Sequence, residues 1–228
     1  MTVIKFLNTF RNYLFVALLF SVLVSVLSTG DVHGFHYLAC VFILISFSIS
    51  KSFYFFNVDT ETITYKIKLF SLSLIANFLF VFIIGGILIY INDFPFLSDN
   101  DDFYYNNQAK DLVNVWSQNG FSLEVLYRGG YSGFPNFSAI LMYVSGIHEW
   151  WIPRIGNSIL ASFVVVFIFN IINRVYSNQN LAKLISSILA FSPIILIYAS
   201  VQLKDMMLLF LVLGMFNYYI RGVLKKFS

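Results

Sequence analysis

The carboxylates that could do chemistry in this chain are concentrated in one polar stretch, residues 99–120, which lies between long apolar segments. Near its start stand two adjacent acids, Asp101 and Asp102. One carboxylate can act as a general base on a hydroxyl group, and a second on the same side could bind a divalent metal ion or steer a phosphate-linked donor. The alternative is that these aspartates only cap a helix and lie in a solvated loop. The residue spacing leaves both interpretations open.

The same stretch predicts an amphipathic helix. Its apolar face has helical spacing and consists of Tyr105, Ala109, Leu112 and Trp116. The opposite face is polar and consists of Asn106, Asn107, Lys110, Asp111, Asn114 and Ser117. The segment is too polar to span a bilayer, so we expect it to lie in the membrane interface with Trp116 and the tyrosines of the segment at headgroup depth. Asp99 or Asn100 would cap the first turn, and Gly120 would end the helix.

The composition is that of a multi-span membrane protein. The chain has 228 residues, of which 59% are hydrophobic and 11% charged, and it contains 27 phenylalanines and 14 tyrosines. A soluble domain could not cover so much apolar surface. The single cysteine, Cys40, excludes a disulfide within the chain and a cysteine metal site. The histidines His33, His36 and His148 are too dispersed for a histidine metal site, and the scattered basic residues give no indication of nucleic-acid binding.

Six apolar segments approach the length of about 20 residues that a transmembrane helix needs. They are residues 13–29, 37–50, 69–92, 155–173, 184–203 and 206–220. The first follows basic residues but lacks a clear signal-peptidase site, which favours a retained span. A seventh run, residues 137–147, is short enough to be re-entrant or interfacial. Between the second and third segments, the TETITYKIK alternation fits a short strand or an interfacial stretch.

The distribution of lysine and arginine decides whether residues 137–147 cross the membrane. If they do not cross, ten of the 14 basic residues lie on one side and four on the other, whereas crossing gives seven on each side. Because cytoplasmic segments are enriched in lysine and arginine, the sequence predicts six spans with both termini in the cytoplasm. The four external basic residues are then Lys110, Arg128, Arg154 and Lys204.

This topology places residues 93–153 in one external loop, which holds seven of the 11 acidic residues. The turn that contains Lys204 and Asp205 opens on the same side. Asp205 is therefore a candidate second carboxylate, and Arg128, Arg154 and Lys204 are candidate cations for a phosphate or pyrophosphate group. Other roles fit these cations as well: Arg154 and Lys204 could snorkel from span ends, and Arg128 could pair with a glutamate four residues earlier.

Four segments, taken in order, resemble the first half of the GT-C membrane glycosyltransferases. They are DDFYYNNQAKDL, GFPNFSAILMYVSG, WIPRIGNSIL and ILAFSPIILIYASVQLKD. The likeness is to the branch that contains the protein O-mannosyltransferases and the lipid A aminoarabinose transferases. In that branch an acidic pair follows the first core span, an arginine stands at the start of the next span, and a Ser-Pro element precedes an aspartate at the second external turn.

The resemblance implies an all-α, polytopic membrane protein. Residues 1–68 would form two additional N-terminal spans and a cytoplasmic connector, and residues 69–228 the N-terminal half of a GT-C-like core. It also implies a bacterial inner-membrane location and transfer of a sugar from a polyprenyl-phosphate donor to a glycan, lipid or protein acceptor. Family members continue through further spans, so we expect the chain to be a truncated reading frame or one part of a longer protein.

The resemblance also implies roles for individual residues. Asp101 takes the catalytic-aspartate position, Asp102 completes the acidic pair, and Asp205 takes the second acidic position. Any divalent metal ion would be held by Asp101 and Asp205. The substrate-binding residues would be Tyr105, Arg128, Arg154 and Lys204.

Two other functions fit the same sequence. A polysaccharide repeat-unit polymerase uses the same carrier chemistry but adds whole oligosaccharides. A non-catalytic integral membrane protein or transporter subunit would need no catalytic carboxylate. Transport is favoured by charged residues inside the spans, and these spans contain almost none.

Overall fold

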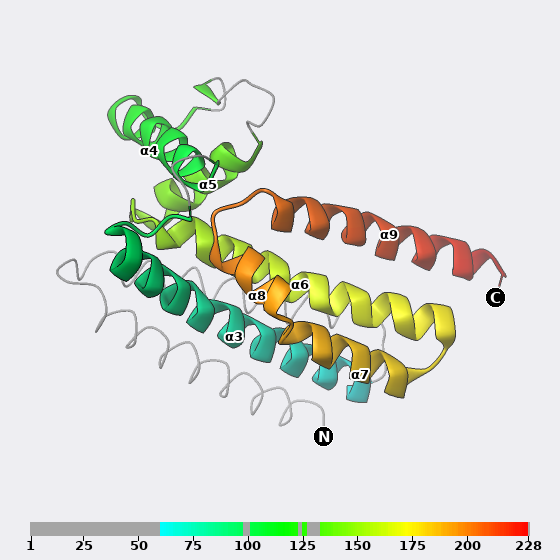
Figure 1. The fold of residues 1–228 in the computed structure, drawn as a ribbon. Helices are drawn as coiled ribbons and strands as arrows, with labels where there is room; N and C mark the ends of the chain where they lie inside the picture. Colours follow the sequence, from blue (N-terminus) through cyan, green and yellow to red (C-terminus); the bar gives the residue numbers. More distant parts are fainter. Residues whose placement is uncertain (1–59, 98–100, 123–124, 127–132, 228) are drawn as a thin grey trace. The chain divides into compact units, whose positions relative to one another are not determined.

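The computed structural model describes residues 60–97, 101–122, 125–126 and 133–227. Within these residues the regular structure is α-helical, as predicted, and Figure 1 labels its helices. They are α3 (Thr60–Asn92), α4 (Asp101–Asn119), α5 (Gly133–Ser145), α6 (Trp151–Tyr176), α7 (Gln179–Ala190), α8 (Pro193–Ser200) and α9 (Asp205–Phe227). Residues 64–143 and those from His148 onward form one compact unit, whereas residues 60–63 and 144–147 group with a second one. The predicted spans 13–29 and 37–50 lie outside the described residues.

Two helices, α3 and α6, are long and apolar enough to cross a membrane. A third candidate is the pair α7 and α8, whose axes are bent by 49° at a short break. Helices α3 and α6 contain the predicted spans 69–92 and 155–173, and the pair covers the predicted span 184–203 as far as Ser200. Helix α5 has 13 residues and is too short to cross a bilayer alone, which agrees with the prediction for this run. The predicted span 206–220 lies within α9 and stays a prediction, as does the total of six.

Helix α3 begins before its predicted span, because the TETITYKIK segment forms its first turns and is not a strand. Tyr65 provides the reason: its ring lies 5.2 Å from the ring of Phe169 in α6, and its hydroxyl donates to the Lys183 carbonyl of α7 at 2.9 Å. Such packing overrides a short alternation of residue types. The helix ends at Asn92, and the next residue, Asp93, has a left-handed φ of 63° and donates its N–H to the Ile89 carbonyl at 2.9 Å.

The predicted span 184–203 is interrupted in the structure by Pro193, the first residue of α8. Proline has no N–H to continue a helix, and it disfavours helical geometry in the residue before it. Ser192 is accordingly extended, with ψ of 128°. The Ser192 N–H still bonds to the Leu189 carbonyl at 3.1 Å, so the break leaves this donor satisfied, as a membrane segment requires.

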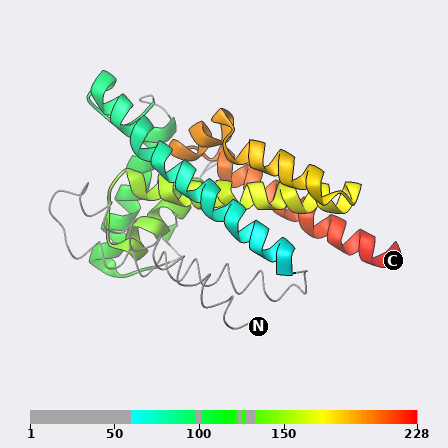
Figure 2. The same cartoon turned by 90° about the horizontal axis from the view of Figure 1, so that it is seen from below.

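Helix α6 lies between α3 and α9 in Figure 1, and Figure 2 shows α3 crossing it obliquely. Aromatic side chains join α3 and α6 along their length. Phe70 lies 5.0 Å from Phe163, and Phe82 lies 6.3 Å from Trp151, measured between ring centres. Because later residues of α3 meet earlier residues of α6, the two helices are antiparallel.

Helix α9 runs in the same direction as α6. The ring of Phe210 lies 5.9 Å from that of Phe163, and nearer the other end Arg174 donates from Nη1 to the Asn217 carbonyl at 3.1 Å. Helices α7 and α8 lead the chain from the end of α6 back to the start of α9. Arg154 and Arg174 stand 20 positions apart in α6, which corresponds to about 30 Å, the thickness of a bilayer's hydrocarbon core.

Helix α4 ends where the sequence predicted, at Gly120, which adopts a left-handed φ of 81°. Its apolar face is buried, but against protein. The Trp116 ring lies 4.8 Å from Phe121 and 5.6 Å from Tyr143 of α5, and its Nε1 donates to the Ser122 carbonyl at 3.0 Å. With 1% of its surface exposed, Trp116 is covered by protein side chains, and the depth of α4 in a membrane stays a prediction.

The buried stripe of α4 is also wider than predicted and takes in part of the polar face. Its members are Asp102, Tyr105, Asn106, Gln108, Ala109, Leu112, Val113 and Trp116. Because the predicted capping residues Asp99 and Asn100 lie outside the described residues, the cap stays a prediction.

Candidate functional site

The acidic pair at the start of α4 is divided between the surface and the interior. Asp101 is exposed, whereas Asp102 has 1% of its surface exposed. Asp102 Oδ2 accepts the N–H of Leu97 at 2.7 Å, and its Oδ1 accepts the N–H of Phe103 at 3.0 Å. A carboxylate in the first turn of a helix is further stabilised by the helix dipole. Asp102 therefore ties the segment before α4 to the helix, and its neighbour Asp101 remains accessible.

Arg154, on the first turn of α6, is completely buried beside Asp102. Its Nη2 lies 3.9 Å from Asp102 Oδ2 and also donates to the carbonyl of Pro95. The guanidinium carbon lies 4.7 Å from the ring centre of Trp150 and 5.5 Å from that of Phe96, which favours cation–π attraction. Nε and Nη1 have no hydrogen-bond partner among the described residues. The ion pair joins the start of α6 to the start of α4.

Asn157, one turn further along α6 on the same side of the helix, holds the loop between α8 and α9. Its Nδ2 donates to the carbonyls of Val201 and Leu203 at 2.9 and 3.1 Å. The loop continues into Lys204, which is half-buried, and Asp205, which is exposed in the first turn of α9. The same side of α6 thus positions the start of α4 and the start of α9.

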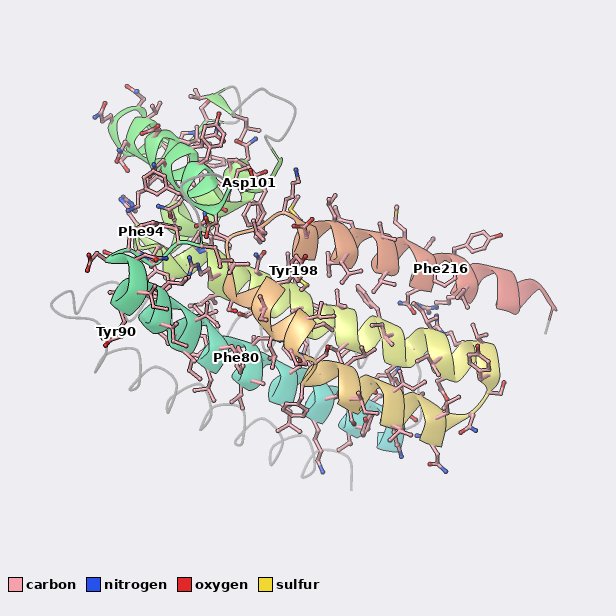
Figure 3. All side chains as sticks on the ribbon, in the orientation of Figure 1. Phe80, Tyr90, Phe94, Asp101, Tyr198 and Phe216 are labelled. Atoms are coloured by element: carbon pink, nitrogen blue, oxygen red, sulfur yellow. The ribbon has the colours of Figure 1, made fainter. Side chains whose placement is uncertain are left out.

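The start of α5 lies against both of these helix starts. The ring of Phe134 lies 5.6 Å from that of Tyr105 in α4, and a Cβ added at Gly133 would lie 3.5 Å from Met207 Cε in α9. Figure 3 labels Asp101 at the first turn of α4, at this end of the bundle. The two exposed aspartates therefore belong to helix starts that both contact α5.

The predicted binding residues have different surroundings. Tyr105 is 2% exposed and packs in the core between α4 and α5, so its ring is covered by protein. Arg154 is buried and paired with Asp102. Lys204 is half-buried in the loop before α9, and Arg128 lies outside the described residues. The structure thus brings one predicted cation and one predicted carboxylate into direct contact.

Sequence reasoning missed two buried polar side chains at this end, Asn157 and Gln202. Gln202 is fully buried, and neither polar atom of its amide has a partner in the part of the chain that the structure describes. Asn157 stands three positions after Arg154 in an otherwise apolar run, a spacing that places both on one side of a helix and could have identified it. Gln202 has no comparable signal, because its burial depends on the fold of the loop.

A metal centre built from several ligands is not found among the described residues, since no three His, Cys, Asp or Glu side chains there are grouped to hold an ion. Asp101 and Asp205 stay the predicted pair for a metal ion.

No protein-family model, curated protein or solved structure matches this chain.

Proposed function

We propose that this chain forms part of a membrane transferase that moves a sugar from a polyprenyl-phosphate donor to an acceptor hydroxyl at the external face of the membrane. The observation that most directly supports this is the placement of the exposed Asp101 beside Asp102, a carboxylate that is buried and paired with Arg154. This pair fixes the first turn of α4 against a membrane-spanning helix. An accessible carboxylate is thereby held in one position, as a general base requires.

The depth of Asp101 suits a lipid-linked donor. A polyprenyl tail lies in the bilayer and its phosphate lies at headgroup level. Arg154 and Arg174 are separated in α6 by about the thickness of the hydrocarbon core, so the first turn of α6 belongs at one membrane surface. The excess of basic residues at the opposite end favours the external surface for Asp101.

The proposed reaction is a displacement at the first carbon of the sugar. Asp101 takes the proton of the acceptor hydroxyl as the hydroxyl oxygen bonds to that carbon. The bond between the carbon and the phosphate oxygen breaks, and the phosphate leaves with the electron pair, which inverts the configuration of the sugar. Asp102 and Arg154 act as positioning residues, because Asp102 already accepts backbone hydrogen bonds and the two are paired.

Lys204 and Arg128 are the cations that we propose for neutralising the departing phosphate. Asp205, exposed at the start of α9, would orient the acceptor or share a divalent metal ion with Asp101.

The test is sugar transfer by the full-length protein in proteoliposomes that contain a radiolabelled polyprenyl-phosphate sugar. Loss of a general base typically costs about 100- to 10,000-fold in rate, so Asp101→Asn should reduce transfer by that factor while membrane insertion stays intact. Asp111→Asn is the matched control, because Asp111 is an exposed carboxylate on the same helix. Transfer by Asp101→Asn at the rate of the Asp111→Asn control would refute the assignment.

The same assay separates the two rival functions. A repeat-unit polymerase would consume a polyprenyl-linked oligosaccharide and leave the monosaccharide donor untouched. A non-catalytic membrane protein would consume neither donor, and the buried pair of Asp102 and Arg154 would then serve only to join α4 to α6.

A further inference from the structure

We propose that the other end of the helix bundle binds the phosphate headgroup of an anionic phospholipid. Four helices each place a cation at this end, which we call the basic end: Lys66 of α3, Arg174 of α6, Lys183 of α7 and Arg221 of α9. These four helix ends lie together because α3 is antiparallel to α6, α9 is parallel to α6, and α7 starts directly after α6. Figures 1 and 2 both show these four helix ends on the same side of the unit.

Lys66 is the innermost of these cations, with 7% of its surface exposed. Its ammonium group lies 5.5 Å from the centre of the Phe169 ring, and it makes no ion pair with a described side chain. Arg174 is close enough for the two positive charges to repel each other. A buried ammonium group without a negative partner is costly, so an anion bound at this position would remove an unfavourable interaction.

Arg174 is half-buried and is held in a fixed orientation. Its Nη1 donates to the carbonyl and to Oδ1 of Asn217, at 3.1 and 3.3 Å, which uses one edge of the guanidinium group. It forms no ion pair with a described side chain, and the charge of Arg221 repels it. A fixed guanidinium with donors to spare is the group that best recognises a phosphate oxygen pair.

A lipid is the ligand that fits this position best. The basic end lies about one hydrocarbon thickness from Arg154 along α6, which places it where phospholipid phosphates lie. Next to it, Tyr176, Tyr218 and Tyr219 are largely exposed, and tyrosines are enriched at this depth in membrane proteins. Basic sites between transmembrane helices are known to bind anionic headgroups, and the acyl chains would cover the exposed apolar side chains of α9.

The test measures lipid binding by the purified full-length chain in dodecyl maltoside. Native mass spectrometry counts bound lipids while phosphatidylglycerol, phosphatidylcholine or inorganic phosphate is added, and thermal unfolding is followed in parallel. We expect phosphatidylglycerol to bind and to raise the unfolding temperature more than phosphatidylcholine does. Lys66→Met should weaken phosphatidylglycerol binding by about tenfold or more, the loss expected for one charge-assisted hydrogen bond.

Lys68→Gln is the matched control, because Lys68 is exposed on the same helix two positions away and should bind phosphatidylglycerol as the wild type does. Lys66→Met removes a buried charge and should fold in phosphatidylcholine at least as well as the wild type. Arg174→Gln provides an independent variant at the same site. Equal binding of the two lipids, equal loss in Lys66→Met and Lys68→Gln, or stabilisation by inorganic phosphate equal to that by phosphatidylglycerol would each overturn the proposal.

Discussion

Replacing Arg154 with methionine should destabilise the folded chain by about 3–5 kcal/mol, the usual cost of leaving one partner of a buried ion pair uncompensated. The partner here is Asp102, whose Oδ2 lies 3.9 Å from Arg154 Nη2, with 1% and 0% of the two side chains exposed. At that separation and an effective dielectric constant of about 20, the attraction is about 4 kcal/mol. Removing both charges together should cost much less, because the desolvation of both groups is then avoided.

The assay is equilibrium unfolding in mixed micelles as the fraction of sodium dodecyl sulfate is raised, with the free energy of unfolding determined for four proteins. They are the wild type, Arg154→Met, Asp102→Asn and the double variant. The asparagine can still accept a backbone hydrogen bond, so the double variant should be more stable than Arg154→Met alone. If the losses of the two single variants simply add in the double variant, the pair is not energetically coupled, and the reasoning fails.

Three further predictions concern other parts of the fold. Cysteines introduced at Asn119 and Asn178 should be labelled from opposite sides of the membrane, Asn119 from outside and Asn178 from the cytoplasm. Labelling of both from the same side would mean that residues 137–147 cross the membrane and that Asp205 lies on the side opposite Asp101. Gly85→Ala should lower the free energy of unfolding by about 1–3 kcal/mol, because the added Cβ would collide with the indole ring of Trp150. Its neighbour Gly86 has nothing within 4 Å of an added Cβ, so Gly86→Ala should gain up to about 1 kcal/mol in the same unfolding assay, and similar effects at both positions would contradict the packing. Trp116→Ala should cost about 3–5 kcal/mol, and a loss below about 1 kcal/mol would show that its burial contributes little.

The bounds of α4 could be predicted from sequence because every signal is local. Apolar residues recur at helical spacing, an acidic pair stands in the first turn, and Gly120 follows the last turn. What the helix packs against is not a local property. Trp116 is covered by Phe121 and Tyr143, and helical spacing alone cannot distinguish a face that meets lipid from one that meets protein.

The candidate site could be predicted only in part for the same reason. The acidic pair was identifiable as a site from its composition, but adjacent helix residues point about 100° apart, and nothing local indicates which one is buried. Arg154 decides this by pairing with Asp102 from a position 52 residues later in the chain. Similarly, Pro193 is a local signal for the bend between α7 and α8. The apolar content of residues 184–203 alone, however, predicts one continuous span.

The separation of Arg154 and Arg174 along α6 has to match the hydrocarbon thickness of the membrane. Arg154 is held by Asp102, and Arg174 is held by Asn217, so neither side chain is free to stretch toward water when the bilayer becomes thicker. A spanning helix normally relieves such mismatch by tilting or by extending its flanking side chains. Here tilting would have to move α3 and α9 together with α6, because both pack along it. The lipids around this bundle should therefore deform before the helix does, and its stability in bilayers should pass through a maximum at one acyl-chain length.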